Sequence, residues 1–352
     1  MKYYLKINGL RFIAIFLVLV EHFAYFIGKD ITAGYYGVDL FFVISGFLVT
    51  SILLATKKES FKENYSHFIG RRTLRIFPVY YFTIFILWMI GLDAVRKNLF
   101  SLLTYTFNYA SIHNNIGPNP VFQFWSLAVE EQFYLLWPFI IIPLKKKPLL
   151  LLGIISIVVI VGYSQQIFSI FPCVSAYNYV SLLTRMASLG LGALGAVLAT
   201  YNLLPVKFFK NRFIEYVILS LLILTLFLNY KIKVLVLGLC SLYLVLKVSF
   251  FDLSYGPFNK FLCNRYIMYI GTISYGIYVF HGPISYYFGQ YIFDPFWNGI
   301  RFESLGKFNK LEWHPWIIKF PLYSLLSIGV AALSFKYFET PILKLKDRFF
   351  RY

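Results

Sequence analysis

The stretch GYYGVDLFFVISGFLVTSILLAT, residues 34–56, is almost entirely apolar and contains a single charged residue, Asp39. A helix needs about 20 mainly apolar residues to cross a bilayer, so this stretch is long enough to span a membrane. Similar segments recur along the chain and predict ten membrane-spanning helices, at 5–27, 34–56, 77–93, 123–144, 148–164, 181–201, 214–230, 232–250, 266–289 and 316–338. The shorter segment 99–110 is predicted to be a re-entrant or surface helix. The sequence therefore predicts an all-α, polytopic membrane bundle forming one domain over residues 1–352.

The composition supports this prediction. Hydrophobic residues make up 59% of the chain, aromatic residues 21% and charged residues only 14%, whereas soluble domains contain about 25% charged residues. These values exclude a disordered chain, a nucleic-acid-binding module and an ordinary cytosolic enzyme. The net charge of +18 is instead expected to set the topology and to meet anionic lipid head groups.

The positive charges also predict an orientation. With a cytoplasmic N-terminus, the ten spans assign 21 of the 33 Lys and Arg residues to the inner side and nine to the outer side. Cytoplasmic loops carry an excess of Lys and Arg. Both termini are therefore predicted to lie in the cytoplasm.

Two ionisable residues lie in the first predicted span. Arg11 and His22 are 11 residues apart, which corresponds to about three helical turns plus 20°, so both lie on one face about 16 Å apart along the axis. Ionisable groups within a bilayer are costly and are candidates for function. Each also has a structural alternative, because Arg11 could extend to inner head groups and His22 could bond a neighbouring helix.

The fourth predicted span contains adjacent carboxylates, Glu130 and Glu131. Glu130 is predicted at a depth similar to those of His22 and Asp39, where a carboxylate could orient the imidazole. Ser126 lies one turn from Glu130 on the same face, and Glu131 points about 100° away. Asp39 could equally serve helix packing.

A cluster of arginines precedes the third predicted span, at the end of a loop with the sequence GRRTLRIFP (70–78). Arg72 and Arg75 share a helix face, and Arg71 is adjacent. Guanidinium groups suit phosphate, so the cluster is a candidate site for an anionic cofactor. The alternative is a topological anchor that meets lipid phosphates.

Other polar residues carry weaker signals. Arg185, in the outer half of the sixth span, is a supporting candidate, whereas His281 before Gly-Pro is interpreted as a capping or packing residue. Cys173, Cys240 and Cys263 are scattered, and neither a disulfide framework nor a metal site is expected. The arginines gather toward the inner side of the membrane, and the histidine and carboxylates gather in the outer half. This pattern suggests that an anionic cofactor binds from the cytoplasm and that proton transfer takes place further out.

The chain resembles the acyltransferase-3 family, which are integral-membrane bacterial O-acyltransferases of surface sugars. The resemblance covers essentially the whole chain. The family signature Arg-x10-His falls on Arg11 and His22, and Arg-x-x-Arg falls on Arg72 and Arg75. The motifs that carry it are GLRFIAIFLVLVEH (9–22), GYYGVDLFFVISGFLVTS (34–51), RRTLRIFPVYY (71–81), FWSLAVEEQFYLLWP (124–138), ISYGIYVFH (273–281) and YFETP (337–341).

The resemblance implies an acyltransferase that moves an acyl group, usually acetyl, from cytoplasmic acyl-CoA to a hydroxyl of an extracytoplasmic sugar or polysaccharide. Arg11, Arg71, Arg72 and Arg75 would bind acyl-CoA, with His22 as base or acyl carrier and Glu130 as its partner. An appended extracytoplasmic esterase-like domain is expected to be absent. Asn8 stands where the family usually has Asp, which removes no proposed catalytic group.

Two other classes of protein share some of these features. A flippase or exporter of lipid-linked sugars would also need many spans and intramembrane charges, but it would need broken helices, and the spans are expected to be largely unbroken. A sensor bundle would show no turnover. The sequence identifies neither the acceptor sugar nor the acyl chain, and it leaves open whether the protein forms a homo-oligomer.

Overall fold

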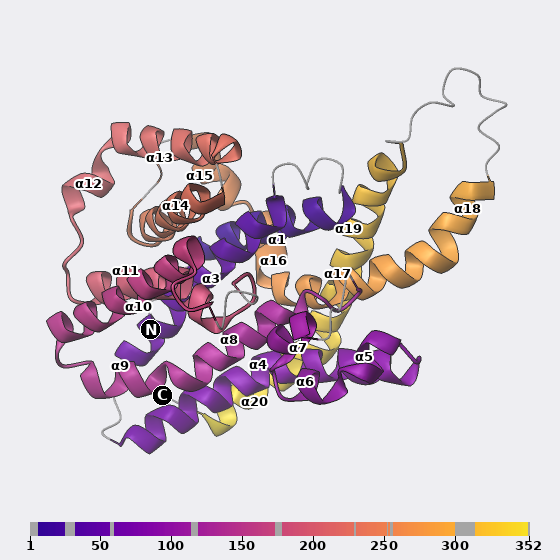
Figure 1. The fold of residues 1–352 in the computed structure, drawn as a ribbon, viewed down its shortest axis with the longest axis horizontal. Coiled ribbons are helices and arrows are strands. Elements are labelled where there is room, and N and C mark those ends of the chain that lie inside the picture. The colour runs from indigo at the N-terminus through magenta and orange to yellow at the C-terminus, as the bar shows by residue number, and fades with distance from the viewer. Residues whose placement is uncertain are drawn as a thin grey trace.

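The computed structural model describes residues 6–24, 32–56, 60–113, 119–172, 178–228, 230–251, 253, 256–299 and 314–350. Within these ranges the regular structure is entirely helical (Figure 1). The helices are α1 (Ile7–Phe23), α3 (Ala33–Leu54), α4 (Phe61–Met89), α5 (Asp93–Lys97), α6 (Leu99–Leu103), α7 (Phe107–His113), α8 (Phe124–Leu136), α9 (Pro138–Leu144), α10 (Pro148–Phe168), α11 (Leu182–Thr200), α12 (Val206–Lys210), α13 (Arg212–Leu224), η2 (Thr225–Phe227), α14 (Tyr230–Phe250), α15 (Gly256–Leu262), α16 (Arg265–Thr272), α17 (Ser274–Phe288), η3 (Gly289–Phe293), α18 (Asp294–Gly299), α19 (His314–Ser334), η5 (Phe335–Glu339) and α20 (Thr340–Phe349).

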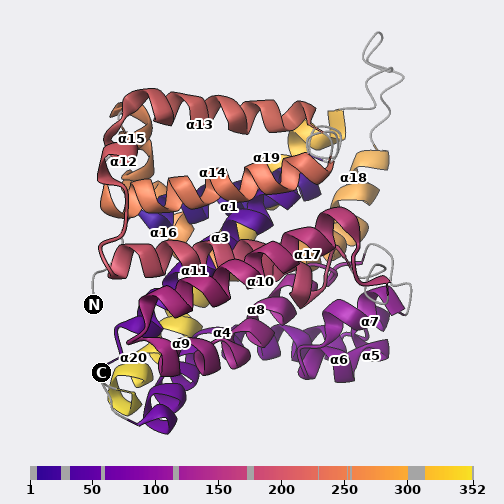
Figure 2. The ribbon, with the colours of Figure 1, turned by 60° about the vertical axis from the view of Figure 1, so that its left-hand side comes forward.

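A helix falls within each of the ten predicted spans. Six helical segments of the described chain are long and apolar enough to cross a membrane; they are Ala33–Leu54, Phe124–Leu144, Pro148–Phe168, Leu182–Thr200, Ile232–Phe250 and Ile317–Leu345. The all-helical membrane fold is therefore confirmed, and the count of ten stays a prediction. Figure 2 shows α8, α10, α11 and α14 running side by side, with the start of α1 and the end of α20 toward the same end of the bundle.

Helix α3 is the centre of the bundle, because it packs against both α1 and α11. Glycines permit this close approach: a Cβ at Gly46 would collide with the carbonyl oxygen of Leu189, and one at Gly192 would collide with that of Val43. Small residues are typical of helix interfaces in membranes. Gly46 and Gly192 therefore allow the close approach of α3 and α11, and this contact fixes the face of α3 that remains for the functional residues.

The arginine cluster does not end a loop, as the sequence analysis expected, but lies within α4. Helix α4 begins at Phe61, well before the predicted start of the span, and continues through Pro78. Its buried side chains include Asn64, Phe68 and Ile76, which are spaced in multiples of four. One helix face is therefore packed along the whole length, and this packing extends the helix beyond the apolar segment.

The ninth predicted span is not one helix, which corrects the expectation of unbroken spans. Helix α16 ends at Thr272 and α17 begins at Ser274. At the break, Gly271 packs against the carbonyl oxygen of Asn8, and Asn8 Nδ2 donates a hydrogen bond to Thr272 Oγ1 over 3.1 Å. These contacts with the start of α1 hold the chain where α16 and α17 meet, and they leave Ser274 at the N-terminus of α17.

The segment 99–110 forms the short helix α6 and the first part of α7, separated by Tyr105 at φ 53°. Both helices are too short to cross a bilayer, as predicted. Asn108 Nδ2 donates to Val180 O over 3.1 Å, and Gln132 Nε2 donates to Tyr105 O over 2.7 Å. The segment is therefore packed against α8 through satisfied polar groups.

Candidate active site

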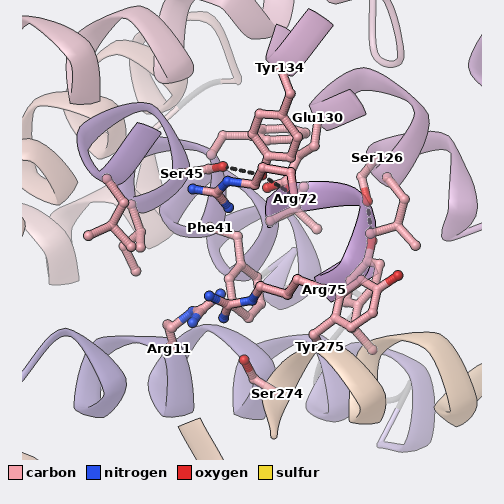
Figure 3. A pocket seen from close by; sticks show the side chains of 16 residues that line it. Arg11, Phe41, Ser45, Arg72, Arg75, Ser126, Glu130, Tyr134, Ser274 and Tyr275 are labelled. Carbon is pink, nitrogen blue, oxygen red and sulfur yellow. Dashed lines mark hydrogen bonds between the residues drawn. The ribbon is translucent and has the colours of Figure 1, made fainter. Parts of the chain in front are cut away.

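A cavity of about 70 Å³ lies between α1, α3, α4, α8 and α17. Figure 3 shows side chains from these helices pointing into it. The lining residues are Arg11, Val38, Phe41, Phe42, Ile44, Ser45, Leu48, Arg72, Arg75, Ser126, Leu127, Glu130, Tyr134, Ser274, Tyr275 and Tyr278.

Three arginines line this cavity. Arg72 and Arg75 come from one face of α4, as their spacing predicted, and Arg11 comes from α1. Figure 3 shows the side chains of Arg11 and Arg75 converging across the cavity. The guanidinium carbon of Arg72 lies 4.9 Å from the centre of the Tyr134 ring. Guanidinium groups suit phosphate, so this part of the cavity is a candidate site for an anionic ligand.

Arg71 does not belong to this cluster. It is one residue from Arg72 and therefore points about 100° away around α4. Its Nη1 atom donates a hydrogen bond of 2.5 Å to the carbonyl oxygen of Phe350, just beyond α20. Arg71 is not among the residues that line the cavity, so this placement does not support the prediction that it acts with Arg72 and Arg75.

Glu130 contacts the arginines of the cavity and a tyrosine on its own helix. The hydroxyl of Tyr134 donates to Glu130 Oε2 over 2.8 Å and lies 2.6 Å from the hydroxyl of Ser45. The Glu130 carboxylate also interacts electrostatically with Arg72 and Arg11. Among the contacts described for Glu130, none joins it to His22, so the expected carboxylate–imidazole pair is not formed. Glu130 instead balances the charge of the arginine cluster.

His22 lies beside a second histidine, outside the lining of the cavity. Its Nδ1 atom is 2.8 Å from the carbonyl oxygen of Val18 on the same helix. Its ring centre is 4.8 Å from that of His281, with the two rings at 72°. His22 is exposed, whereas His281 is completely buried. The interpretation of His281 as a simple cap missed this pairing, although its place in a predicted span was a usable signal.

Tyr278 links the cavity to the histidine pair. Its hydroxyl is 2.6 Å from that of Ser126, and both residues line the cavity. Its ring centre is 5.6 Å from that of His281. The order in space is therefore cavity, Tyr278, His281 and His22. Ser126 lies in the lining as a supporting residue, one turn from Glu130 on α8.

Asp39 and Arg185 form a separate cluster between α3 and α11. Ser188 Oγ donates a hydrogen bond to Asp39 Oδ1, and Asp39 interacts electrostatically with Arg185. Arg185 Nε donates to the carbonyl oxygen of Tyr179 over 2.8 Å, and its guanidinium carbon is 5.2 Å from the Trp125 ring centre. Neither Asp39 nor Arg185 lines the cavity. This arrangement is compatible with the helix-packing alternative for Asp39, and a supporting role for Arg185 stays a prediction.

Glu131 points away from the cavity, as the helical rotation predicted. Its carboxylate interacts electrostatically with the Tyr80, Tyr105 and Tyr275 hydroxyl groups. It is buried among aromatic side chains at the junction of α4, α8 and α17. A supporting role for Glu131 stays a prediction.

Sequence reasoning missed several residues of the cavity. Tyr134 lies one turn after Glu130, and this i, i+4 spacing was a signal that could have identified it. Glu339 lies outside the lining, but its carboxylate interacts electrostatically with Arg75 and accepts a hydrogen bond from Ser334 Oγ over 3.2 Å. No local pattern connects Glu339 to Arg75, because the two lie far apart in sequence.

A metal centre has no support in the residues that the structure describes, where no group of three or more His, Cys, Asp or Glu side chains is gathered. Cys240 and Cys263 are free thiols. Cys173 lies outside the described residues.

Comparison with known proteins matches the chain to a family. The family model described as "Acyltransferase domain" matches residues 4–336. Peptidoglycan O-acetyltransferase OatA of Listeria monocytogenes is 30% identical over 80% of this chain and 49% of its own length. Putative peptidoglycan O-acetyltransferase YrhL of Bacillus subtilis is 26% identical over 97% of this chain and 55% of its own length. O-acetyltransferase OatA of Staphylococcus aureus is 25% identical over 97% of this chain and 58% of its own length.

The chain thus spans about half the length of these curated relatives. No solved structure matches it. The family model covers nearly the whole chain, including both histidines, the three cavity arginines and Glu130. The chain therefore belongs to the acyltransferase-3 family.

Proposed function

We propose that this protein is a membrane O-acetyltransferase, which transfers an acetyl group from acetyl-CoA to a hydroxyl group of a peptidoglycan-like glycan outside the cell. The curated relatives are named for O-acetyl transfer, two of them to peptidoglycan. The cavity with Arg11, Arg72 and Arg75 is the observation that carries the proposal, because the CoA part of such a donor is a phosphate-rich anion. We place this cavity toward the cytoplasm and both termini on that side, in the cell membrane.

The donor is held by charge and shape. Arg11, Arg72 and Arg75 bind phosphate oxygens through charge-assisted hydrogen bonds. Glu130 balances the arginines when the site is empty and is itself held by Tyr134. Ser274 brings the N-terminus of α17 to the lining, and the N–H groups of a helix N-terminus favour anions.

His22 carries out the proton transfer. It takes the proton of the acceptor hydroxyl, and the hydroxyl oxygen bonds to the acetyl carbon while the carbon–sulfur bond of the thioester breaks. The proton then passes to the departing CoA thiolate. A placed general base contributes about 10²–10⁴-fold in rate. Tyr278 stands between the cavity and the histidine pair, so the acetyl group has to pass it.

Acetyl transfer by the purified chain tests this function. The protein in lipid vesicles is given radiolabelled acetyl-CoA and soluble peptidoglycan fragments, and labelled glycan is quantified. We expect wild-type turnover and a loss of about 10²–10⁴-fold in His22→Ala. Val20→Ala, on the same helix, is a matched control expected to keep its activity. Unchanged transfer by His22→Ala at equal protein level would contradict the assignment of the base.

A lipid-linked sugar flippase is the second candidate, because the break between α16 and α17 beside Ser274 is of the kind found in transporters. Vesicles with a fluorescent lipid-linked sugar distinguish the two functions. Movement of the lipid without any use of acetyl-CoA would favour the flippase.

A further inference from the structure

His281 has a buried atom for which the structure gives no partner. The side chain is 0% exposed, and its Nε2 atom makes no hydrogen bond within the described residues. Buried polar atoms are nearly always hydrogen-bonded, so each exception asks for an explanation. The neighbouring ring is that of His22, at 4.8 Å between centres.

The backbone fixes the proton positions on both rings. His22 Nδ1 lies 2.8 Å from the carbonyl oxygen of Val18, and His281 Nδ1 lies 2.7 Å from that of Tyr278. A carbonyl oxygen can only accept, so each Nδ1 carries a hydrogen. In a neutral imidazole the other nitrogen is then an acceptor. Both Nε2 atoms therefore have a lone pair and no proton.

The two neighbouring rings can share one additional proton. With none, both Nε2 atoms are acceptors, and no hydrogen bond joins them. With one proton on His22 Nε2, a small rotation of the rings lets His281 Nε2 accept it in an N–H···N hydrogen bond. With two protons, like charges at this distance would repel.

We propose that His281 is a positioning residue for His22. After His22 has taken the proton of the acyl acceptor, His281 Nε2 accepts a hydrogen bond from His22 Nε2. The inference rests on the proposed function, in which His22 is the base. His281 also keeps the His22 ring in place before the reaction through the edge-to-face contact. It does not touch the substrate.

Two amide substitutions separate this role from a structural one. Glutamine places its amide at the position of Nε2, whereas asparagine places its amide at the position of Nδ1. His281→Asn keeps a donor for the Tyr278 carbonyl oxygen and loses the Nε2 acceptor. His281→Gln keeps an acceptor at Nε2 and loses the bond to Tyr278. If His281 has only a structural role, His281→Asn should retain more activity than His281→Gln. If His281 has the proposed role, His281→Gln should retain more activity.

The measurement is kcat and KM for acetyl-CoA in the vesicle assay, with thermal stability as a control. We expect His281→Asn to lower kcat by about 10–100-fold, within the range of general-base effects, with KM unchanged. His281→Gln should stay within about threefold of wild type in kcat. The double variant His22→Ala/His281→Asn should be no slower than His22→Ala alone, because His281 acts through His22. Any of three results would overturn the proposal: a wild-type kcat in His281→Asn, an equal loss of kcat in both amide variants, or additive losses of kcat in the double variant.

Nitrogen-15 spectra of histidine-labelled protein give a test that needs no active variant. The wild type should show His281 protonated at Nδ1. The His281 signal is identified because it is absent from the spectrum of His281→Gln. If that variant does not fold, the signal is identified by its change when His22 is protonated. A proton on Nε2 of His281 in the neutral protein would overturn the proposal. Absence of any acetyl transfer by the wild type would contradict the proposed function instead, and the two failures are therefore distinguishable.

Discussion

Two clusters in the described part of the bundle, the Arg185 cluster between α3 and α11 and the arginine cluster of the cavity, differ in what surrounds them. In the α3–α11 cluster, Arg185 is 1% exposed, bonds the carbonyl oxygen of Tyr179 and lies beside the Tyr35 and Trp125 rings. Arg72, by contrast, contacts one face of Tyr134 and lines the open cavity between α1, α3, α4, α8 and α17. Both clusters contain a carboxylate near the arginine. Only the second has room for a ligand.

This difference shows that an ionisable residue in an apolar helix is not sufficient to mark a ligand site. The groups of Arg185 are satisfied by the protein itself, so its charge stabilises helix packing. The cavity arginines are arranged around space that a second molecule can fill. The two clusters should therefore respond differently to the same substitution, one in stability and the other in donor binding.

The largest expected effect is on stability, in Arg185→Met. The substitution leaves the Asp39 carboxylate buried without the opposing charge, and breaking such a pair costs about 3–5 kcal/mol. Thermal unfolding in detergent should show a clear decrease in midpoint, while KM for acetyl-CoA in the remaining folded protein should not change. Adding Asp39→Asn should restore part of the stability. An unchanged midpoint with a raised KM would place Arg185 in the donor site.

The next effect is on donor binding, in Arg72→Met and Arg75→Met. A hydrogen bond to a charged group contributes about 1.5–3 kcal/mol, so each variant should raise KM for acetyl-CoA about 10–100-fold, with thermal stability nearly unchanged. Arg71→Met is the matched control, because Arg71 contacts Phe350 on another face of α4. Arg72→Lys should be intermediate, since a lysine keeps the charge but not the planar fork.

Equal KM increases in Arg71→Met and Arg72→Met would mean that the cluster acts as a general positive surface. In that case the arginines would be topological anchors, which is the alternative that their spacing alone left open.

Much of the fold could be predicted, because apolar length is a property of each segment. A helix overlaps every predicted span. The continuous α4 and the break before Ser274 were not predicted. Both depend on distant contacts, such as that between Gly271 and Asn8, and no window of sequence contains them.

The candidate site was also predicted only in part, because some of its contacts join residues that are distant in sequence. Helical periodicity correctly put Arg72 and Arg75 on one face and turned Glu131 away from Glu130. It could not show that Glu130 would lie beside Arg72 rather than His22, because that depends on how α8 is rotated against α1 and α4. The pairing of His22 with His281 joins the first helix to a late one, so periodicity carries no information about it.

The smallest expected effect compares two serines, Ser188 and Ser45, one in each cluster. Ser188 donates to the buried Asp39 carboxylate, where water cannot replace it, so Ser188→Ala should lower stability by about 1–3 kcal/mol. Ser45 bonds the Tyr134 hydroxyl at the wall of the open cavity, where a water molecule can take over the bond. Ser45→Ala should therefore cost less than about 1 kcal/mol in stability and change KM for acetyl-CoA by a few fold through Tyr134. Denaturation of both variants under one set of detergent conditions measures the difference. Equal losses of stability would mean that the cavity is as closed as the Arg185 cluster, and the contrast on which the donor site rests would fail.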